Sequence, residues 1–184
     1  MKIVAGLGNP GAEYAATRHN VGYRVLDIVA ARTGAAPWRT RFKGLAAKAA
    51  LGGAEVWLLK PTTFMNASGE SVAEAVRFYK VAPEDLLVVA DDMGLEPGAL
   101  RVRRGGSSGG HKGLQSVEEM LGTSEYPRLR VGIGPSPETD ATGYVLGRFR
   151  PSELAAAAEA ELRAADAVET WVLNGVERCM NDFN

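Results

Sequence analysis

Two histidines are the side chains of this sequence best suited to move a proton near neutral pH. His19 lies in the run Thr17-Arg18-His19-Asn20, just before an expected helix, and His111 follows a run of glycines. Hydrolases that work near neutral pH most often use histidine as the general base, because the unperturbed imidazole titrates there. A histidine that only caps a helix or lies on the surface is the commoner case, so residue type alone leaves both roles open.

Two carboxylates, Asp91 and Asp92, directly follow the continuously apolar run 86–90. Such a run is typical of a central strand buried on both faces, and α/β proteins place active-site groups at the carboxyl ends of these strands. One carboxylate could accept a hydrogen bond from a histidine and thereby fix the tautomer of its ring. Two alternatives stay open here: a magnesium site, and a strand-end turn favoured by the glycines and proline that follow.

A glycine pattern closes the first expected strand. Gly6, Gly8 and Gly11 match the G-x-G-x-x-G spacing of dinucleotide-binding proteins. The match is incomplete, because Pro10 lies inside it and the acidic residue expected at the end of the second strand is absent. The pattern therefore favours a tight turn that aims Asn9 into a pocket, with a nucleotide-binding oxidoreductase as the alternative enzyme.

Two further segments could line such a pocket. The segment 105–113 has five glycines in nine residues, so a bulky ligand could lie against its backbone. Phe64, Met65 and Asn66 combine an aromatic ring, a thioether and an amide, which suits a partly apolar pocket with a polar handle. Asn66 could equally be the N-cap of the helix that follows.

The elements that must position these residues alternate between strands and helices. Helices are expected over 20–33, 67–80, 113–121 and 152–173. Strands are expected over 2–7, 45–50, 55–60, 86–90, 100–104 and 129–133. This order predicts an α/β fold with a twisted mixed, largely parallel sheet and helices on both faces, in a single domain over residues 1–184.

Length, composition and charge limit the possible classes. The chain has 184 residues, of which 46% are hydrophobic and 23% charged, as in a globular domain that buries a core without disulfides or a metal. Its net charge of −1 hides an asymmetry: residues 1–130 carry 17 basic and 13 acidic side chains, and residues 131–184 carry 4 and 9. Two windows, 28–54 and 97–117, contain no acidic residue. The chain could therefore present a basic surface to a polyanion.

The single cysteine and the absence of long apolar runs indicate the cellular setting. Cys179 stands alone, which excludes an internal disulfide framework and a multi-cysteine zinc site, and we expect it to be a packing residue. No apolar run approaches the ~20 residues of a membrane span, and the N-terminal segment has the pattern of a strand and lacks that of a signal peptide. We therefore expect a cytoplasmic protein.

A set of separated motifs, taken in order, is more specific than any one of them. The set comprises Gly6-Leu7-Gly8-Asn9-Pro10-Gly11, Tyr14, Thr17-Arg18-His19-Asn20-Val21-Gly22, Lys60-Pro61, Phe64-Met65-Asn66, Asp91-Asp92, Gly109-Gly110-His111 and Arg128-Leu129-Arg130-Val131-Gly132-Ile133-Gly134. Together these motifs resemble bacterial peptidyl-tRNA hydrolase, from Lys2 to about Arg150.

The resemblance implies hydrolysis of the ester bond between a peptidyl group and the 3′ end of tRNA, which recycles peptidyl-tRNA dropped during translation. In that family the histidine matching His19 is the general base that activates water, and the aspartate matching Asp91 supports it. The asparagine matching Asn9 helps to distinguish peptidyl-tRNA from aminoacyl-tRNA. Contacts to the substrate end are implied for Tyr14, Phe64 and Asn66.

The resemblance also implies how the tRNA is held. Arg103 and Arg130 match positions that hold a terminal phosphate of tRNA. If the strands 100–104 and 129–133 are neighbours, Arg101, Arg103, Arg128 and Arg130 could form one basic patch beside the glycine segment. One departure is Lys112, which stands where the family usually has a substrate-binding asparagine and which offers donors but no acceptor.

The implied enzyme is a monomer without metal or cofactor, and it binds the acceptor stem and 3′ end of peptidyl-tRNA with no obligatory protein partner and no membrane. An RNA-binding module that has lost the activity is the non-enzymatic alternative. The presence of both His19 and Asp91 argues against that alternative.

Overall fold

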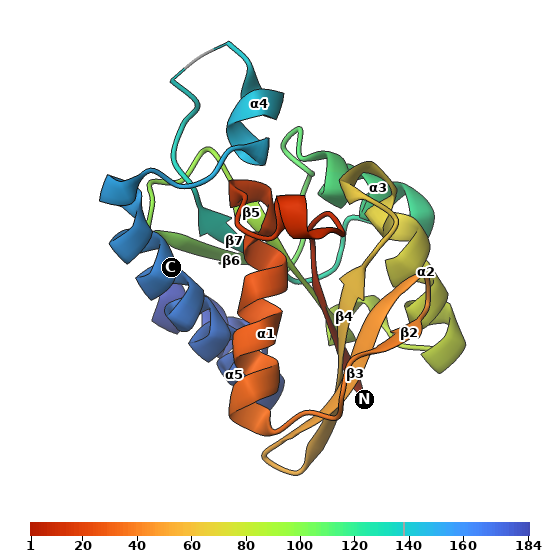
Figure 1. Ribbon diagram of the computed structural model, residues 1–184. Coiled ribbons are helices and arrows are strands. Elements are labelled where there is room, and N and C mark those ends of the chain that lie inside the picture. Colours follow the sequence, from red (N-terminus) through yellow and green to blue (C-terminus); the bar gives the residue numbers. More distant parts are fainter. Residues whose placement is uncertain (138) are drawn as a thin grey trace.

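The computed structural model, which describes residues 1–137 and 139–184, is built on one seven-stranded sheet (Figure 1). The strand order is β2-β3-β4-β1-β5-β7-β6. Four neighbouring strands run parallel in the middle of the sheet: β4 (Ala54–Pro61), β1 (Lys2–Gly6), β5 (Leu86–Asp92) and β7 (Arg128–Gly132). These strands are rich in Val, Leu, Ile and Ala because both of their faces are covered.

The remaining strands extend the sheet at its two edges. β3 (Gly44–Leu51) pairs antiparallel with β4, and β2 (Arg39–Arg41) pairs antiparallel with β3. At the other edge, β6 (Leu100–Arg103) pairs antiparallel with β7. The predicted mixed, largely parallel sheet is therefore confirmed.

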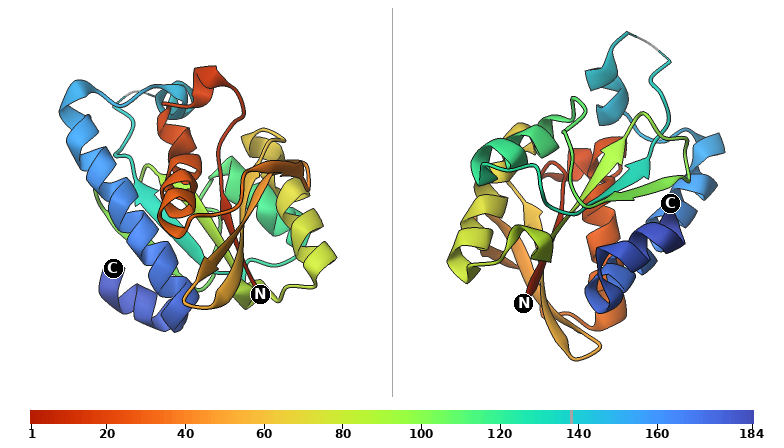
Figure 2. Two further views of the ribbon diagram at one scale, coloured as in Figure 1. Left: turned by 60° about the horizontal axis from the view of Figure 1, so that its bottom comes forward. Right: turned by 180° about the vertical axis from the view of Figure 1, so that it is seen from behind.

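Helices cover both faces of the sheet, as predicted (Figures 1 and 2). α1 (Val21–Thr33) and α5 (Leu154–Phe183) pack on one face, in a core that includes Val25 and Trp171. α2 (Ser68–Tyr79) and α3 (Lys112–Leu121) pack on the other face, in a core that includes Val72 and Leu114.

Three features differ from the sequence expectation. β2 was not expected, because Arg39-Thr40-Arg41 has no apolar alternation. The short helix α4 (Ala141–Leu146) was not expected either, because six residues carry too little periodicity. The C-terminal helix continues to Phe183, beyond the expected end at 173, across a kink at Gly175 where φ is 83°.

The first glycine pattern serves close packing. A Cβ on Gly6 would lie 2.3 Å from the carbonyl oxygen of Gly22, so α1 rests directly on the end of β1. Two short 3₁₀ turns, Ala12–Tyr14 and Arg18–Asn20, separate the glycines from the start of α1. A dinucleotide-binding helix would begin at the glycines themselves, so this geometry removes the support for the oxidoreductase alternative.

Two further expectations concern the core and the membrane. Cys179 is buried and its Sγ lies 3.2 Å from the carbonyl oxygen of Ala167, as expected of a packing residue. Within the described ranges, no helix combines the length and the apolarity needed to cross a membrane.

Candidate active site

A pocket of about 820 Å³ opens at the carboxyl ends of the central strands. Its polar side includes Asn9 after β1, Asp91 and Asp92 at the end of β5, and both histidines. This is the place at which open α/β sheets bind ligands, because the loops that follow the parallel strands meet there. Three segments supply most of the other lining residues: Phe64–Asn66, the glycine segment 105–113 with Leu114, and the helix α4. Met93, Gly94 and Arg130 complete the lining.

His19 is held by Asp91. The 3₁₀ turn before α1 carries His19, and the Nδ1 atom of His19 lies 2.7 Å from Oδ1 of Asp91. Since an ionised carboxylate only accepts, Nδ1 is the protonated nitrogen and donates. The Nε2 atom of His19 is then the ring nitrogen left without a proton on the pocket side.

His111 contacts the same carboxylate oxygen. Its Nε2 atom lies 2.8 Å from Oδ1 of Asp91, and its Nδ1 atom accepts hydrogen bonds from the backbone N–H groups of Gly113 and Leu114 at 3.1 and 3.2 Å. Because a backbone N–H can only donate, Nδ1 is unprotonated and the ring proton must be on Nε2. The amino end of α3 therefore fixes His111 as a donor to Asp91, a relationship that sequence reasoning missed although it singled out both residues.

Asp91 is almost completely buried, with 3% of its surface exposed. Burial by itself raises the pKa of a carboxyl, but the interactions with His111 and then His19 outweigh it and hold the pKa of Asp91 below its usual range. Asp91 is thus kept as a carboxylate that can orient an imidazole.

Asn9 points its side chain toward the same pocket. Its Oδ1 atom accepts a hydrogen bond from the backbone N–H of Met65 at 2.7 Å. Among the described residues, none accepts a hydrogen bond from the amide nitrogen of Asn9, so this nitrogen can donate to a ligand, while the acceptor end is already used. This hydrogen bond also joins the turn after β1 to the segment after β4.

Phe64 has a strained backbone. Its φ and ψ angles are 63° and 159°, a region that is essentially restricted to glycine, and 51% of its surface is exposed. The ring of Tyr14 meets the ring of Phe64 edge-on at 6.4 Å, so Tyr14 supports Phe64 and does not itself line the pocket. Asn66 lines the pocket with an exposed side chain, and it is not the N-cap of α2 as one reading of the sequence suggested.

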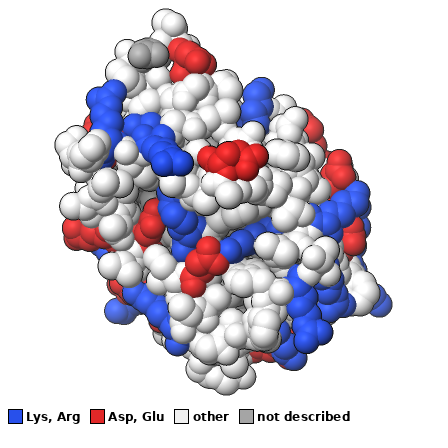
Figure 3. Space-filling model, in the orientation of Figure 1, with Lys and Arg blue, Asp and Glu red and all other residues white. Residues whose placement is uncertain are grey.

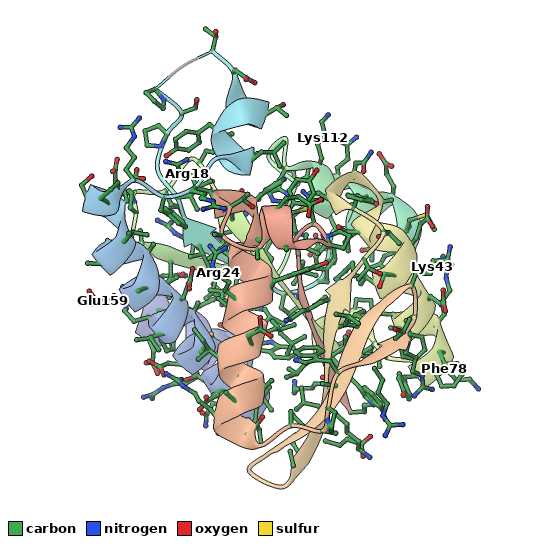
Figure 4. All side chains as sticks on the ribbon, in the orientation of Figure 1. Arg18, Arg24, Lys43, Phe78, Lys112 and Glu159 are labelled. Carbon is green, nitrogen blue, oxygen red and sulfur yellow. The ribbon has the colours of Figure 1, made fainter. Side chains whose placement is uncertain are left out.

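An apolar wall of the pocket comes from α4, which the sequence did not predict. Val145 and Leu146 line it. Arg18, the neighbour of His19, holds this wall: its guanidinium lies 4.1 Å from the ring centroid of Tyr144 and its Nη2 atom lies 2.9 Å from Glu153. Figure 4 shows Arg18 beneath α4.

The predicted phosphate-binding arginines differ in their surroundings. β6 and β7 are neighbours as expected, and Arg103 is exposed. Arg130 lines the pocket and its Nη2 atom donates to the carbonyl oxygen of Ser107 at 2.8 Å. Arg128 is buried and paired with Glu118 at 3.0 Å, so the expectation that it joins a surface patch is wrong.

Lys112 begins α3 and extends an exposed side chain at the rim of the pocket (Figure 4). Among the described residues, no carboxylate pairs with its ammonium group. A cation at this rim is available to an anionic or carbonyl group of a ligand.

The two histidines and Asp91 also form the single group of three potential metal ligands found in the described part of the chain, with ligand atoms within 4.8 Å of one another. Both ring nitrogens that face Asp91 donate hydrogen bonds to it, and Nδ1 of His111 is taken by backbone amides. A metal bound between these atoms would have to displace the ring proton of each histidine, and both protons are already bonded to Oδ1 of Asp91. The donor set therefore fits a hydrogen-bonded triad better than a metal centre.

An α/β domain with an imidazole–carboxylate pair at the strand ends belongs to the broad class of α/β enzymes that act on a ligand bound beyond the sheet. Comparison with known proteins narrows this class. A family model described as peptidyl-tRNA hydrolase matches residues 3–184, and the chain belongs to this family of hydrolases, which cleave an ester bond.

Individual peptidyl-tRNA hydrolases are similar to this chain over its full length. The chain is 50% identical to the peptidyl-tRNA hydrolase of Symbiobacterium thermophilum, with 100% of this chain and 98% of the relative covered. It is 46% identical to the enzyme of Thermoanaerobacter sp. strain X514, with both chains covered completely. A crystal structure of peptidyl-tRNA hydrolase from Acinetobacter baumannii superposes with a TM-score of 0.94 at 35% identity, covering 100% of this chain and 94% of that one.

Proposed function

We propose that this protein hydrolyses the ester that joins a peptidyl group to the 3′ end of tRNA, with His19 as the general base. The observation that carries the proposal is the 2.7 Å contact between Nδ1 of His19 and Asp91, which leaves Nε2 as the basic nitrogen beside the pocket. Nε2 takes a proton from a water molecule, and the water oxygen attacks the ester carbonyl carbon. The bond to the ribose oxygen then breaks, and that oxygen takes the proton back from His19.

The surrounding residues have distinct parts in this mechanism. Asp91 fixes the tautomer of His19 and stabilises the imidazolium that forms during the reaction. His111 is a positioning residue that holds Asp91 by a second hydrogen bond. The amide nitrogen of Asn9 donates to the carbonyl oxygen as negative charge develops on it.

The rest of the pocket binds the substrate. Phe64, supported by Tyr14, and the apolar wall of α4 contact the peptidyl end. Asn66 and Lys112 contact polar groups of the same end. Phosphates near the acceptor stem are held by Arg103 and Arg130 through their guanidinium donors.

The biological setting follows from this activity. We propose that the protein acts in the cytoplasm as a monomer, without a cofactor or an obligatory protein partner. There it recycles tRNA from peptidyl-tRNA that is released prematurely during translation.

The test is release of the blocked amino acid from an N-acetylated aminoacyl-tRNA by the purified protein. His19→Ala should lower turnover by ~10²-fold or more, since a positioned general base contributes about 10²–10⁴. His111→Ala should have a milder effect because Asp91 keeps its hydrogen bond with His19. Near-normal turnover in a folded His19→Ala variant would rule out the role of this residue. Intact RNA binding without hydrolysis by the wild-type protein would favour the non-enzymatic alternative.

A second experiment separates this mechanism from metal catalysis. A chelator should leave hydrolysis of an already folded tRNA substrate largely intact, whereas Asp91→Asn should lower it. Complete loss in chelator, restored by added magnesium or zinc without any change in tRNA folding, would contradict the mechanism.

A further inference from the structure

A cluster of one arginine and four aromatic rings lies on β2, β4 and α2, and the proposed hydrolysis makes no use of it. The guanidinium carbon of Arg41 lies 4.5 Å from the ring centroid of Phe42, 4.9 Å from that of Phe78, and 5.3 Å from those of Trp57 and Tyr79. Among the described residues, none accepts a hydrogen bond from the Arg41 guanidinium or pairs with it as a carboxylate. A guanidinium stacked on rings keeps its N–H donors at its edge, in the fork geometry that matches a phosphate.

Part of this cluster has a structural role. Phe42 and Lys43, in the tight turn between β2 and β3, have φ angles of 55° and 50°, which non-glycine residues rarely adopt. Burial of the Phe42 ring against Phe78 and Tyr79, at 5.4 and 5.5 Å, stabilises this turn. The contact with Phe42 uses only part of the Phe78 side chain, because 61% of the surface of Phe78 is exposed.

Charge around the cluster favours a polyanion. Arg39 lies two residues before Arg41, so both side chains are on the same face of β2, and Lys80 follows the aromatic end of α2. The window 28–54, which contains β2, has no acidic residue. Figure 3 shows Lys and Arg side chains gathered over β2 and β3, at the lower right. We call Arg39, Arg41, Trp57, Phe78, Tyr79 and Lys80 the Arg41 surface.

The Arg41 surface is separate from the pocket. None of its residues lines that pocket, and Figure 4 shows Phe78 and Lys112 well apart on the molecule. β2 and β6 are the two opposite edges of the sheet, six strand spacings apart, which is roughly 29 Å at about 4.8 Å per spacing. The Arg41 surface and Arg103 can therefore hold different nucleic acid segments.

A shallow groove of about 480 Å³ also borders Phe78, and it is lined by both signs of charge, Glu70 and Glu74 together with Lys43 and Arg77. Lys43 pairs with Glu70 at 2.8 Å, so this groove offers a phosphate no excess of positive charge. Among the described residues, no carboxylate pairs with Arg39 or Arg41, so a phosphate backbone is favoured along β2, where these two arginines lie.

We propose that the Arg41 surface binds a single-stranded RNA segment, with Phe78 stacked on a base and with Arg39, Arg41 and Lys80 on phosphates. Exposed aromatic rings beside basic side chains are the usual platform for unpaired RNA, because every base offers a face for stacking. This binding goes beyond the proposed hydrolysis and does not depend on it.

Fluorescence anisotropy with a labelled oligouridylate of about eight nucleotides, which lacks a CCA end, tests the proposal. Phe78→Leu keeps an apolar side chain but removes the ring, and it should weaken binding about 5-fold or more, whereas Phe78→Trp should retain it. Arg39→Gln with Arg41→Gln should reduce the slope of log affinity against log salt by about 0.7 for each phosphate that the arginines no longer neutralise. All variants should hydrolyse a short 3′-terminal substrate at the wild-type rate.

Arg178→Gln is the matched control, because it removes one exposed charge from α5, where Arg178 pairs with Asp182 at 2.7 Å. It should bind the oligonucleotide as the wild type does. Absence of binding by the wild type, or equal affinity of the wild type and Phe78→Leu, would overturn the proposal. Since Phe78 is exposed, the two Phe78 variants decide the question even if the arginine variant does not fold.

Discussion

Asn20 holds the backbone of Asn9 through both ends of its side-chain amide. Oδ1 of Asn20 accepts the N–H of Asn9 at 2.9 Å, and Nδ2 of Asn20 donates to the carbonyl oxygen of Asn9 at 2.9 Å. Both residues are buried. The side-chain amide of Asn20 thus satisfies the backbone N–H and carbonyl groups of Asn9, as a neighbouring strand would in a sheet. It thereby fixes Asn9 after the end of β1, beside the pocket.

Replacing Asn20 by Ala should therefore lower both stability and turnover. Each backbone group of Asn9 left without a partner in the interior costs about 1–3 kcal/mol. Because Asn9 then loses its fixed position, kcat should fall more than KM rises. Denaturant unfolding gives the first quantity and steady-state kinetics the second.

The chain contains a matched control at β6, among residues that do not line the pocket. Asn184 makes the same pair of hydrogen bonds to the N–H and carbonyl oxygen of Val102, at 2.7 and 3.1 Å. Asn184→Ala should lower stability modestly and leave turnover unchanged. If both variants lost turnover only in proportion to stability, Asn20 would have no specific role at the site.

The carboxylate of Asp91 should make the stability of the folded protein depend on pH in the acid range. Its pKa is held below the usual range in the folded protein, so the folded state binds this proton less tightly than the unfolded chain does. Its contribution to stability is therefore present above the unfolded pKa of about 3.9 and is lost as the pH falls below that value. In Asp91→Asn this component should be missing, so the free energy of unfolding should fall less steeply between about pH 4 and 2. Parallel pH profiles of wild type and variant would contradict this assignment.

Arg103 and Arg130 should be distinguishable by the length of the substrate. Arg103 is exposed, so Arg103→Ala should raise KM for full-length peptidyl-tRNA, reduce the salt slope by about 0.7–0.9, and spare a short 3′-terminal fragment. Arg130 also holds Ser107 and lies 3.5 Å from Asp92, so Arg130→Ala should lower turnover on the short fragment as well. A variant that combines Arg103→Ala with Arg130→Ala tests the assignment of the tRNA surface. If its KM for full-length peptidyl-tRNA and the salt dependence of its tRNA affinity were unchanged, the tRNA surface would lie elsewhere, with the basic window 28–54 as the next candidate.

Arg18 should couple α4 to the catalytic turn. It is 4% exposed and joins Glu153 to the backbone of Tyr144, where its Nη1 atom donates to the carbonyl oxygen at 3.2 Å. Removing one partner of a buried pair costs about 3–5 kcal/mol, so Arg18→Met should destabilise the fold by about 3 kcal/mol and raise KM as the apolar wall loosens.

Arg32→Met is the comparison for that variant. Arg32 joins α1 to Asp166 of α5 at 2.7 Å through an exposed ion pair, which contributes about 1 kcal/mol or less. This variant should leave KM unchanged. An equal rise of KM in both variants would show that general loosening, and not the contact with α4, is responsible.

The sequence by itself determined the class of fold and the types of residue at the site. Apolar runs such as 86–90 can only be buried, and alternation with helical periods places them in a sheet covered on both faces. The turn after β1 and the end of β5 follow from that topology, so Asn9, His19 and Asp91 could be assigned to one edge of the sheet before their contacts were known. The short elements β2 and α4 were missed because three and six residues carry almost no periodic signal.

Only the tertiary structure decided how the side chains pair. Whether Asp91 or Asp92 contacts His19 depends on strand alternation and on the position of a turn 72 residues away along the chain. Arg128 and Arg130 are the same residue type and lie two positions apart on one strand. Arg128 is nevertheless buried and paired with Glu118, whereas Arg130 lines the pocket. His111 became a partner of Asp91 because the amide groups at the start of α3 fix its tautomer, and those groups take their direction only when the helix forms. Long-range packing sets each of these contacts, since it selects among side-chain positions that local sequence leaves equally accessible.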